Sequence, residues 1–322
     1  MTDSQATTSG GAELNRTSAR ELAGDIESVR TLTMSRQTIV VRQWKSAAHT
    51  PPAVMVHGLG GNSKNWSYLA PLLVNDVACI APDLPGFGQS PPPRDGDYRP
   101  SGHANAVISV IDELFPGQRV HLFGNSLGGH VATLIAARRP DVVESLTLIS
   151  PALPTFQPAK YSLTVPATAS PVVGARLYRR YARHTPEERA LRLANVVLST
   201  PAAAPPGWLD MVADDFRARE AQTYGEDAYI QTSRELLRAY LYKGPDEAWR
   251  DAARVTAPTL LVFGKRDKLV PLAVARKART AFSRSRLLLL PESGHVAQIE
   301  DADLVAAAWR RFVADDVLTS TS

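Results

Sequence analysis

The decisive stretch of this chain reads Gly124-Asn125-Ser126-Leu127-Gly128-Gly129. It follows the strand-like run 120–123 and leads into a helix-like run at 131–139. Glycines two residues before and after a serine allow a sharp turn from strand to helix, because no side chains collide there. Such a turn leaves the serine hydroxyl exposed at the carboxyl end of the strand. The stretch therefore predicts a nucleophile elbow with Ser126 as the nucleophile.

A serine hydroxyl is a weak nucleophile at neutral pH and needs a base to take its proton. His295 ends the segment Pro-Glu-Ser-Gly-His at 291–295, directly after the apolar run 287–290 and before the amphipathic run 301–313. A histidine on a strand-to-helix loop near the C-terminus fits the role of the base. His295 is thus the candidate base.

The base in turn needs a carboxylate that orients its ring. Asp267 follows the strand-like run 259–263, and the resulting chain order Ser126, Asp267, His295 is the order of elbow-type hydrolases. The other position for this acid comes after the strand predicted at 143–149, where the sequence reads Ser-Pro-Ala-Leu-Pro and has no carboxylate. Asp267 is therefore the candidate acid.

The developing oxyanion needs backbone donors. The Leu127 amide lies at the predicted helix N-terminus, where unpaired N–H groups favour negative charge. A second donor is expected from the loop His-Gly-Leu-Gly-Gly at 57–61, with the Leu59 amide as the candidate. Three further residues are expected to support this loop, namely His57, Gly58 and Gly60.

With these motifs in this order, residues 35–313 resemble the α/β-hydrolase-fold serine hydrolases. The segment Asp-Leu-Pro-Gly-Phe-Gly-Gln-Ser at 83–90 also matches the family's turn after its fourth strand, with a packing role. The alternation of strands and helices over 37–150 predicts a parallel sheet covered on both faces. The resemblance implies an α/β-hydrolase fold, with a mostly parallel eight-stranded sheet wrapped by helices and an inserted helical cap.

The strand pattern disappears after residue 150 and returns at residue 257, with four helical segments between. The Ser-, Thr- and Gly-rich start lacks the pattern of a signal peptide. The predicted organisation is a mobile tail at 1–30, a hydrolase core at 31–150 and 251–316, and a helical cap at 151–250.

The resemblance leaves the substrate class open. Serine at the elbow argues against dehalogenases and epoxide hydrolases of this fold, which need aspartate there. Ester hydrolysis of a small or lipid-like substrate is the first expectation. The elbow and the segment 294–300 are also similar to the meta-cleavage product hydrolases, which split a carbon–carbon bond. Against this, the chain has Gly-Gly-Asn at 60–62 and Val296 where those enzymes tend to have Gly-Pro-Gly and tryptophan. A lyase, an acyltransferase or a noncatalytic receptor is a further alternative.

The composition of the chain limits the kinds of binding partner and cofactor that we expect. The net charge of +4 arises from 36 basic and 32 acidic residues, a mixture that does not predict nucleic-acid binding. The single cysteine, Cys79, excludes a disulfide framework, and no residue cluster predicts a metal or organic cofactor. No apolar run is long enough to span a membrane. We expect a cytoplasmic protein with a small-molecule substrate, either a monomer or a homodimer.

Overall fold

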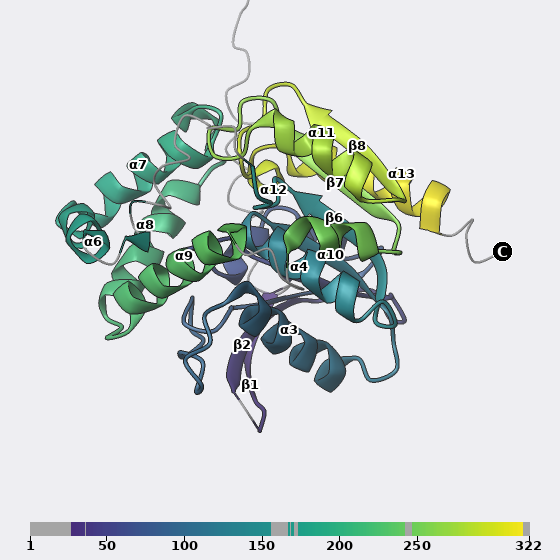
Figure 1. Ribbon diagram of the computed structural model, residues 1–322, viewed down its shortest axis with the longest axis horizontal. Coiled ribbons are helices and arrows are strands. Elements are labelled where there is room, and N and C mark those ends of the chain that lie inside the picture. Colours follow the sequence, from purple (N-terminus) through teal and green to yellow (C-terminus); the bar gives the residue numbers. More distant parts are fainter. Residues whose placement is uncertain are drawn as a thin grey trace, which may run out of the picture.

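The structure, a computed structural model, describes residues 27–35, 37–155, 167, 169–170, 173–241 and 247–317. Eight strands in this part of the chain form one sheet in the order β1-β2-β4-β3-β5-β6-β7-β8 (Figure 1). Strand β2 runs antiparallel to both of its neighbours, and every other pair is parallel. The predicted α/β-hydrolase fold with a mostly parallel eight-stranded sheet is confirmed.

The strands are β1 (Glu27–Thr33), β2 (Thr38–Trp44), β3 (Pro52–Val56), β4 (Ala78–Pro82), β5 (Val120–Asn125), β6 (Val143–Ile149), β7 (Thr259–Gly264) and β8 (Ser285–Leu290). Every residue of β3, β5 and β7 is buried. Continuous apolar runs are typical of parallel strands that are covered on both faces. This burial explains why these strands could be predicted from their apolar runs.

Successive side chains of the central strands enter two separate apolar layers. In β3, Val54 and Val56 pack into one layer, whereas Met55 packs into the other. The first layer contains α3 (Pro100–Leu114), α4 (Leu127–Arg138), α10 (Ala248–Arg254) and α11 (Leu272–Ala281). The second contains η1 (Ser63–Trp66), α2 (Ala70–Leu73), α13 (Ala302–Phe312) and η3 (Val313–Val317). The sheet is therefore a central layer between two groups of helices.

Among the described residues, four further helices lie between β6 and β7 and gather on one side of the sheet (Figure 1). They are α6 (Gly174–Ala182), α7 (Pro186–Val197), α8 (Trp208–Glu220) and α9 (Gly225–Leu241), with the short η2 (Pro201–Ala203) between α7 and α8. Helices α7 and α8 share a small apolar cluster with Val296 and Ile299. Helix α10 packs on α4 instead, so the last residues of the segment predicted as cap belong with the core helices.

The N-terminal segment differs from the expectation at its end. We predicted a tail to residue 30, but Glu27–Arg30 already pair with β2 as the first half of β1. The other residues of the predicted tail, 1–26, lie outside the described part of the chain. Strand β1 is a mostly exposed edge strand, so it lacks the apolar run that reveals a buried strand.

Candidate active site

Ser126 lies at the junction of β5 and α4, with backbone angles φ 54° and ψ −118°. A non-glycine residue with positive φ is strained and must be held by its surroundings. The Ser126 N–H donates to the Ile149 carbonyl at 3.1 Å, and the Ser126 carbonyl accepts from Ala152 at 2.8 Å. From Val120 to Ala136, Ser126 is the one residue that is not buried. The fold thus holds this hydroxyl where a substrate can reach it.

The two flanking glycines allow the close packing of the turn. A Cβ atom on Gly124 would lie 2.3 Å from the Gly128 carbonyl oxygen. A Cβ atom on Gly128 would lie 2.1 Å from the carbonyl oxygen of Val56 in the next strand. Side chains at either position would push α4 away from the sheet.

Asp267 and His295, 28 residues apart in the sequence, lie in direct contact. The Nδ1 atom of His295 is 2.9 Å from an Asp267 carboxylate oxygen, and both side chains are almost fully buried. The other carboxylate oxygen accepts the N–H groups of Leu269 and Val270 at 2.8 and 3.0 Å. Burial raises the pKa of Asp267, but His295 and these backbone donors outweigh it, and the pKa lies below its ordinary value. A carboxylate that accepts at Nδ1 leaves Nε2 of the ring free to take a proton.

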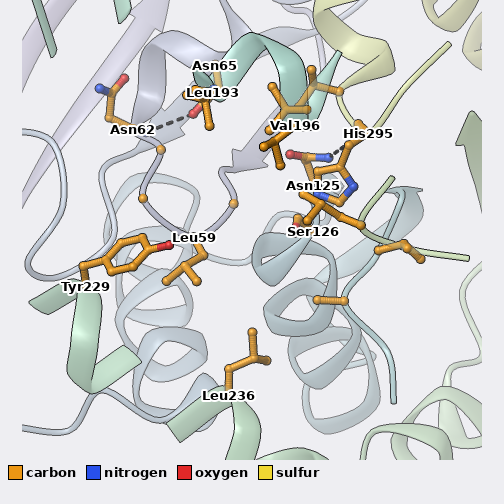
Figure 2. A pocket seen from close by; sticks show the side chains of 18 of the residues that line it. Leu59, Asn62, Asn65, Asn125, Ser126, Leu193, Val196, Tyr229, Leu236 and His295 are labelled. Carbon is orange, nitrogen blue, oxygen red and sulfur yellow. Dashed lines mark hydrogen bonds between the residues drawn. The ribbon is translucent and has the colours of Figure 1, made fainter. Parts of the chain in front are cut away.

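The loop of His295 is held from both sides. Asn125, next to the elbow serine, donates its side-chain amide to the His295 carbonyl at 3.1 Å (Figure 2). It also donates to the Ile149 carbonyl at 3.0 Å. On the other side, the His295 N–H donates to Val197 at the end of α7 at 2.7 Å. The histidine loop therefore connects the elbow to the helices over it.

Glu300, the last residue of α12 (Ala297–Glu300), forms a second connection. Its carboxylate accepts the Gly294 N–H at 2.7 Å and both the N–H and the hydroxyl of Ser199, at 2.9 and 2.5 Å. Burial raises the pKa of this carboxyl. Sequence reasoning assigned no role to Glu300, because one of its two partners, Ser199, lies 101 residues away in the sequence.

The glycine-rich loop forms a tight turn against the elbow. Gly61 donates its N–H to the Gly58 carbonyl at 3.1 Å, and Gly60, the third residue of the turn, has φ 73°. This left-handed conformation is open to glycine and strained for other residues. A Cβ atom on Gly58 would lie 3.1 Å from the Ser126 Cβ atom. The candidate donor Leu59 is thus the second residue of a turn that touches the candidate nucleophile.

His57 is buried beside this turn with both ring nitrogens in hydrogen bonds. Its Nδ1 faces the Gly58 carbonyl at 2.8 Å, and its Nε2 accepts the Leu84 N–H at 3.0 Å. Burial lowers the pKa of His57, in agreement with a neutral ring whose Nε2 is an acceptor. Its ring is therefore engaged with backbone, whereas Nδ1 of His295 faces the buried carboxylate of Asp267.

A cavity of about 600 Å³ lies over the elbow, and its wall is mostly apolar. Ser126, His295 and the turn around Leu59 line it, together with side chains of α6–α9. Figure 2 shows Ser126 next to His295 at the wall, with Leu59 and Tyr229 on the other side of the space. Ser126, His295 and Leu59 are thus brought to one cavity, and Asp267 lies behind His295.

Several residues of the wall were not singled out from the sequence. Asn62, Asp215 and Arg219 line the cavity, although no motif marks them. The arginines at 176, 179, 180, 183 and 192 are exposed, whereas Arg189, which lies among them in the sequence, is 3% exposed and lines the cavity. Helical periodicity alone does not distinguish these environments, because it does not show where a neighbouring helix lies.

In the described part of the chain, no group of three or more His, Cys, Asp or Glu residues is arranged to hold a metal ion. Cys79 is buried, and burial raises the pKa of its thiol. None of the described helices combines the length and the apolar character that crossing a membrane requires.

Most of this chain matches the model of a known family. The model of the alpha/beta hydrolase fold family covers residues 51–302. This chain belongs to the α/β-hydrolase family. The predicted resemblance is confirmed, and the family is one of hydrolases.

Relatives within the family carry different activities in their names. The chain is 24% identical to Lipase 1 of Psychrobacter immobilis over 288 residues, which cover 89% of this chain and 84% of the lipase. It is 27% identical over 274 residues to a 2-hydroxy-6-oxononadienedioate/2-hydroxy-6-oxononatrienedioate hydrolase of Cupriavidus pinatubonensis, with 84% and 88% of the two chains covered. Among solved structures, a bacterial membrane phospholipase A superimposes with a TM-score of 0.72 at 25% identity, covering 94% of this chain and 90% of its own. The family model establishes the family, and these identities of 24–27% leave the substrate open.

Proposed function

We propose that this chain is a serine hydrolase that cleaves carboxylic esters of small or lipid-like substrates through an acyl-enzyme. The observation that carries the proposal is the contact of 2.9 Å between Nδ1 of His295 and buried Asp267, with His295 and Ser126 lining the same cavity. This contact directs Nε2 of His295 to take the serine proton. A metal or organic cofactor has no part in the proposed chemistry.

The proposed steps follow from these positions. His295 takes the Ser126 proton, the serine oxygen attacks the substrate carbonyl, and the backbone N–H groups of Leu59 and Leu127 stabilise the resulting oxyanion. His295 then donates the proton to the leaving alcohol, and Asp267 stabilises the charged ring. Water activated by His295 releases the acid and restores the serine.

The predominantly apolar wall favours an ester with an apolar acyl chain. The cavity contains leucine, valine, phenylalanine and methionine side chains from the core and from α7–α9. The relatives named as a lipase and a phospholipase also support an ester substrate. The segment 151–250 is proposed to act as the cap that shapes this acyl pocket. A small-molecule substrate and a cytoplasmic location remain predictions from the sequence.

The second candidate is hydrolysis of a carbon–carbon bond. Its support is the relative from Cupriavidus pinatubonensis, whose name specifies a hydrolase of a dienedioate. This activity could use the same Ser126, His295 and Asp267. The wall of the cavity, apolar for the greater part, favours the ester over a doubly charged substrate.

The test is a substrate panel on the wild-type protein and on Ser126→Ala. The panel combines p-nitrophenyl esters of increasing chain length with a 2-hydroxy-6-oxodienoate, each followed by absorbance. We expect ester turnover with a chain-length optimum, lowered roughly 10⁴- to 10⁶-fold in Ser126→Ala. Fast turnover of the dienoate with slow ester turnover would assign the second candidate. Product analysis separates hydrolysis from lyase or transferase chemistry, and wild-type turnover in Ser126→Ala would remove Ser126 from the reaction.

A further inference from the structure

One face of α8 contacts the loops of the core next to the elbow. Asp215, Arg219 and Gln222 follow at intervals of four and three residues, so they lie on the same side of the helix and its C-terminal turn. Each makes a hydrogen bond to a core loop more than 130 residues away in the sequence. Gln222, for example, donates to the Gly88 carbonyl at 2.6 Å.

Asp215 binds the segment that follows the glycine turn. One carboxylate oxygen accepts the Asn62 side-chain amide at 2.8 Å, and the other accepts the Lys64 ammonium at 2.6 Å. Asn62 in turn accepts the Lys64 N–H at 2.9 Å and donates its own N–H to the Asn65 side chain at 2.9 Å. Every polar group of the Asn62 side chain is thus engaged, and the residue after the turn has a defined orientation.

Arg219 binds the turn itself. Its guanidinium donates to the Gly60 carbonyl, whereas the hydrogen bond that closes the turn uses the Gly58 carbonyl. The ring of Tyr229 covers the same residue, since a Cβ atom on Gly60 would lie 3.0 Å from it. The third residue of the turn is therefore held from the side of α8 and α9 by a charged donor and an aromatic ring.

We propose that Asp215 and Arg219 are positioning residues that hold the oxyanion turn from α8. The proposal rests on the proposed function, in which the Leu59 N–H stabilises the oxyanion. An oxyanion donor is effective because it is already oriented before the reaction, so that no energy is spent on turning it. Asp215 and Arg219 fix the turn at and after Gly60. The Gly60 carbonyl shares its peptide plane with the Gly61 N–H, which donates to the Gly58 carbonyl in the peptide plane of the Leu59 N–H.

The test compares two pairs of variants on the same helix. Asp215→Asn and Arg219→Met remove the contacts to the turn. Asp214→Asn and Arg217→Met are the matched controls, because Asp214 and Arg217 are exposed and pair with each other and with Glu187. Each variant is assayed for kcat and KM on the best ester and for inhibition by a trifluoromethyl ketone that carries the same acyl chain.

We expect Arg219→Met and Asp215→Asn to lower kcat about 10- to 100-fold, less than the 10²–10³-fold loss typical when an oxyanion donor is removed. The KM should change less than about 2-fold, because the oxyanion forms only in the transition state. Inhibition by the ketone, which forms an oxyanion on the enzyme, should weaken by the same factor as kcat. Arg219→Lys should recover part of the loss, since it keeps one charged donor.

Unchanged kcat in both variants would overturn the proposal. So would an increase in KM alone, because that result would make Arg219 a substrate contact in the cavity wall. A loss of kcat of equal size in Asp214→Asn or Arg217→Met would also overturn it, because that result would show general destabilisation of α8. If Arg219→Met fails to fold, Asp215→Asn and Arg219→Lys still decide the question. Full turnover in Ser126→Ala contradicts the proposed function itself, whereas an inactive Ser126→Ala beside normal α8 variants contradicts the positioning role alone.

Discussion

The backbone N–H of His295 donates a hydrogen bond of 2.7 Å to the carbonyl oxygen of Val197. The candidate base is thereby attached to the last turn of α7, a helix of the inserted segment. Carbonyls at the end of a helix lack intrahelical partners, and the helix dipole makes them favourable acceptors. The same helix end also binds Lys268, the residue that follows the candidate acid Asp267.

Lys268 follows Asp267 and donates its ammonium group to the carbonyls of Asn195 and Leu198, at 2.8 and 2.9 Å. We expect Lys268→Met to lower the free energy of unfolding by about 1–3 kcal/mol, because both charged hydrogen bonds are lost. The kcat should fall as well, since the acid loop loses its attachment to α7. Urea denaturation and ester kinetics measure the two effects. Lys265→Met, at an exposed position of the same loop, is the control and should resemble the wild type.

Asp267→Asn tests the orientation of the base. An amide at this position favours the wrong tautomer of His295, so we expect kcat to fall by about 10⁴-fold while KM stays near its wild-type value. Circular dichroism and thermal melting should show a folded protein. A variant that retains more than about a tenth of the wild-type kcat would exclude Asp267 as the orienting acid.

Gly128→Ala tests the close packing of the elbow. The new Cβ atom would lie 2.1 Å from the Val56 carbonyl oxygen, so α4 or β3 must shift. We expect a loss of about 3 kcal/mol in unfolding free energy and a loss of ester turnover, measured by denaturation and kinetics. The control is Gly117→Ala, at a positive φ with no atom within 4 Å. It should lose only the conformational contribution of about 1–2 kcal/mol and keep its activity.

The pH dependence of stability should include a contribution from His121 in β5. Burial lowers the pKa of His121 from 6.5 to about 4. Between these two values the unfolded chain binds a proton that the folded chain does not bind, so stability falls as the pH falls. We expect His121 to account for a loss of about 2 kcal/mol in unfolding free energy between pH 7 and pH 5.

Denaturation of His121→Gln at both pH values measures this contribution. The variant should lose less stability than the wild type on going to pH 5, whereas His49→Asn, at an exposed position, should follow the wild type. An equal loss in His121→Gln and wild type would contradict the assignment to His121. Other buried histidines, such as His103 with a pKa lowered by burial to about 3, act in the same direction in all three proteins.

Most of the sheet and of the candidate site could be predicted because their signals are local. The apolar runs of β3, β5 and β7 arise from burial on both faces, which requires apolar side chains at consecutive positions. The elbow depends on glycines within two residues of Ser126, since the turn packs against its own strand and helix. Strand β1 could not be predicted in the same way, because a mostly exposed edge strand does not require a run of apolar residues.

The sequence by itself determined the fold family, the chain order of Ser126, Asp267 and His295, and the glycine turn around Leu59. Only the tertiary structure decided which side chains hold these residues in place. Arg219 and Gly60 are 159 positions apart, and Asp215 and Asn62 are 153 positions apart. Such contacts depend on how α7 and α8 pack over the core, which is set by side-chain shape and hydrogen bonding between distant segments. No spacing within one helix contains that information, so the cap side of the site emerged only from the packed structure.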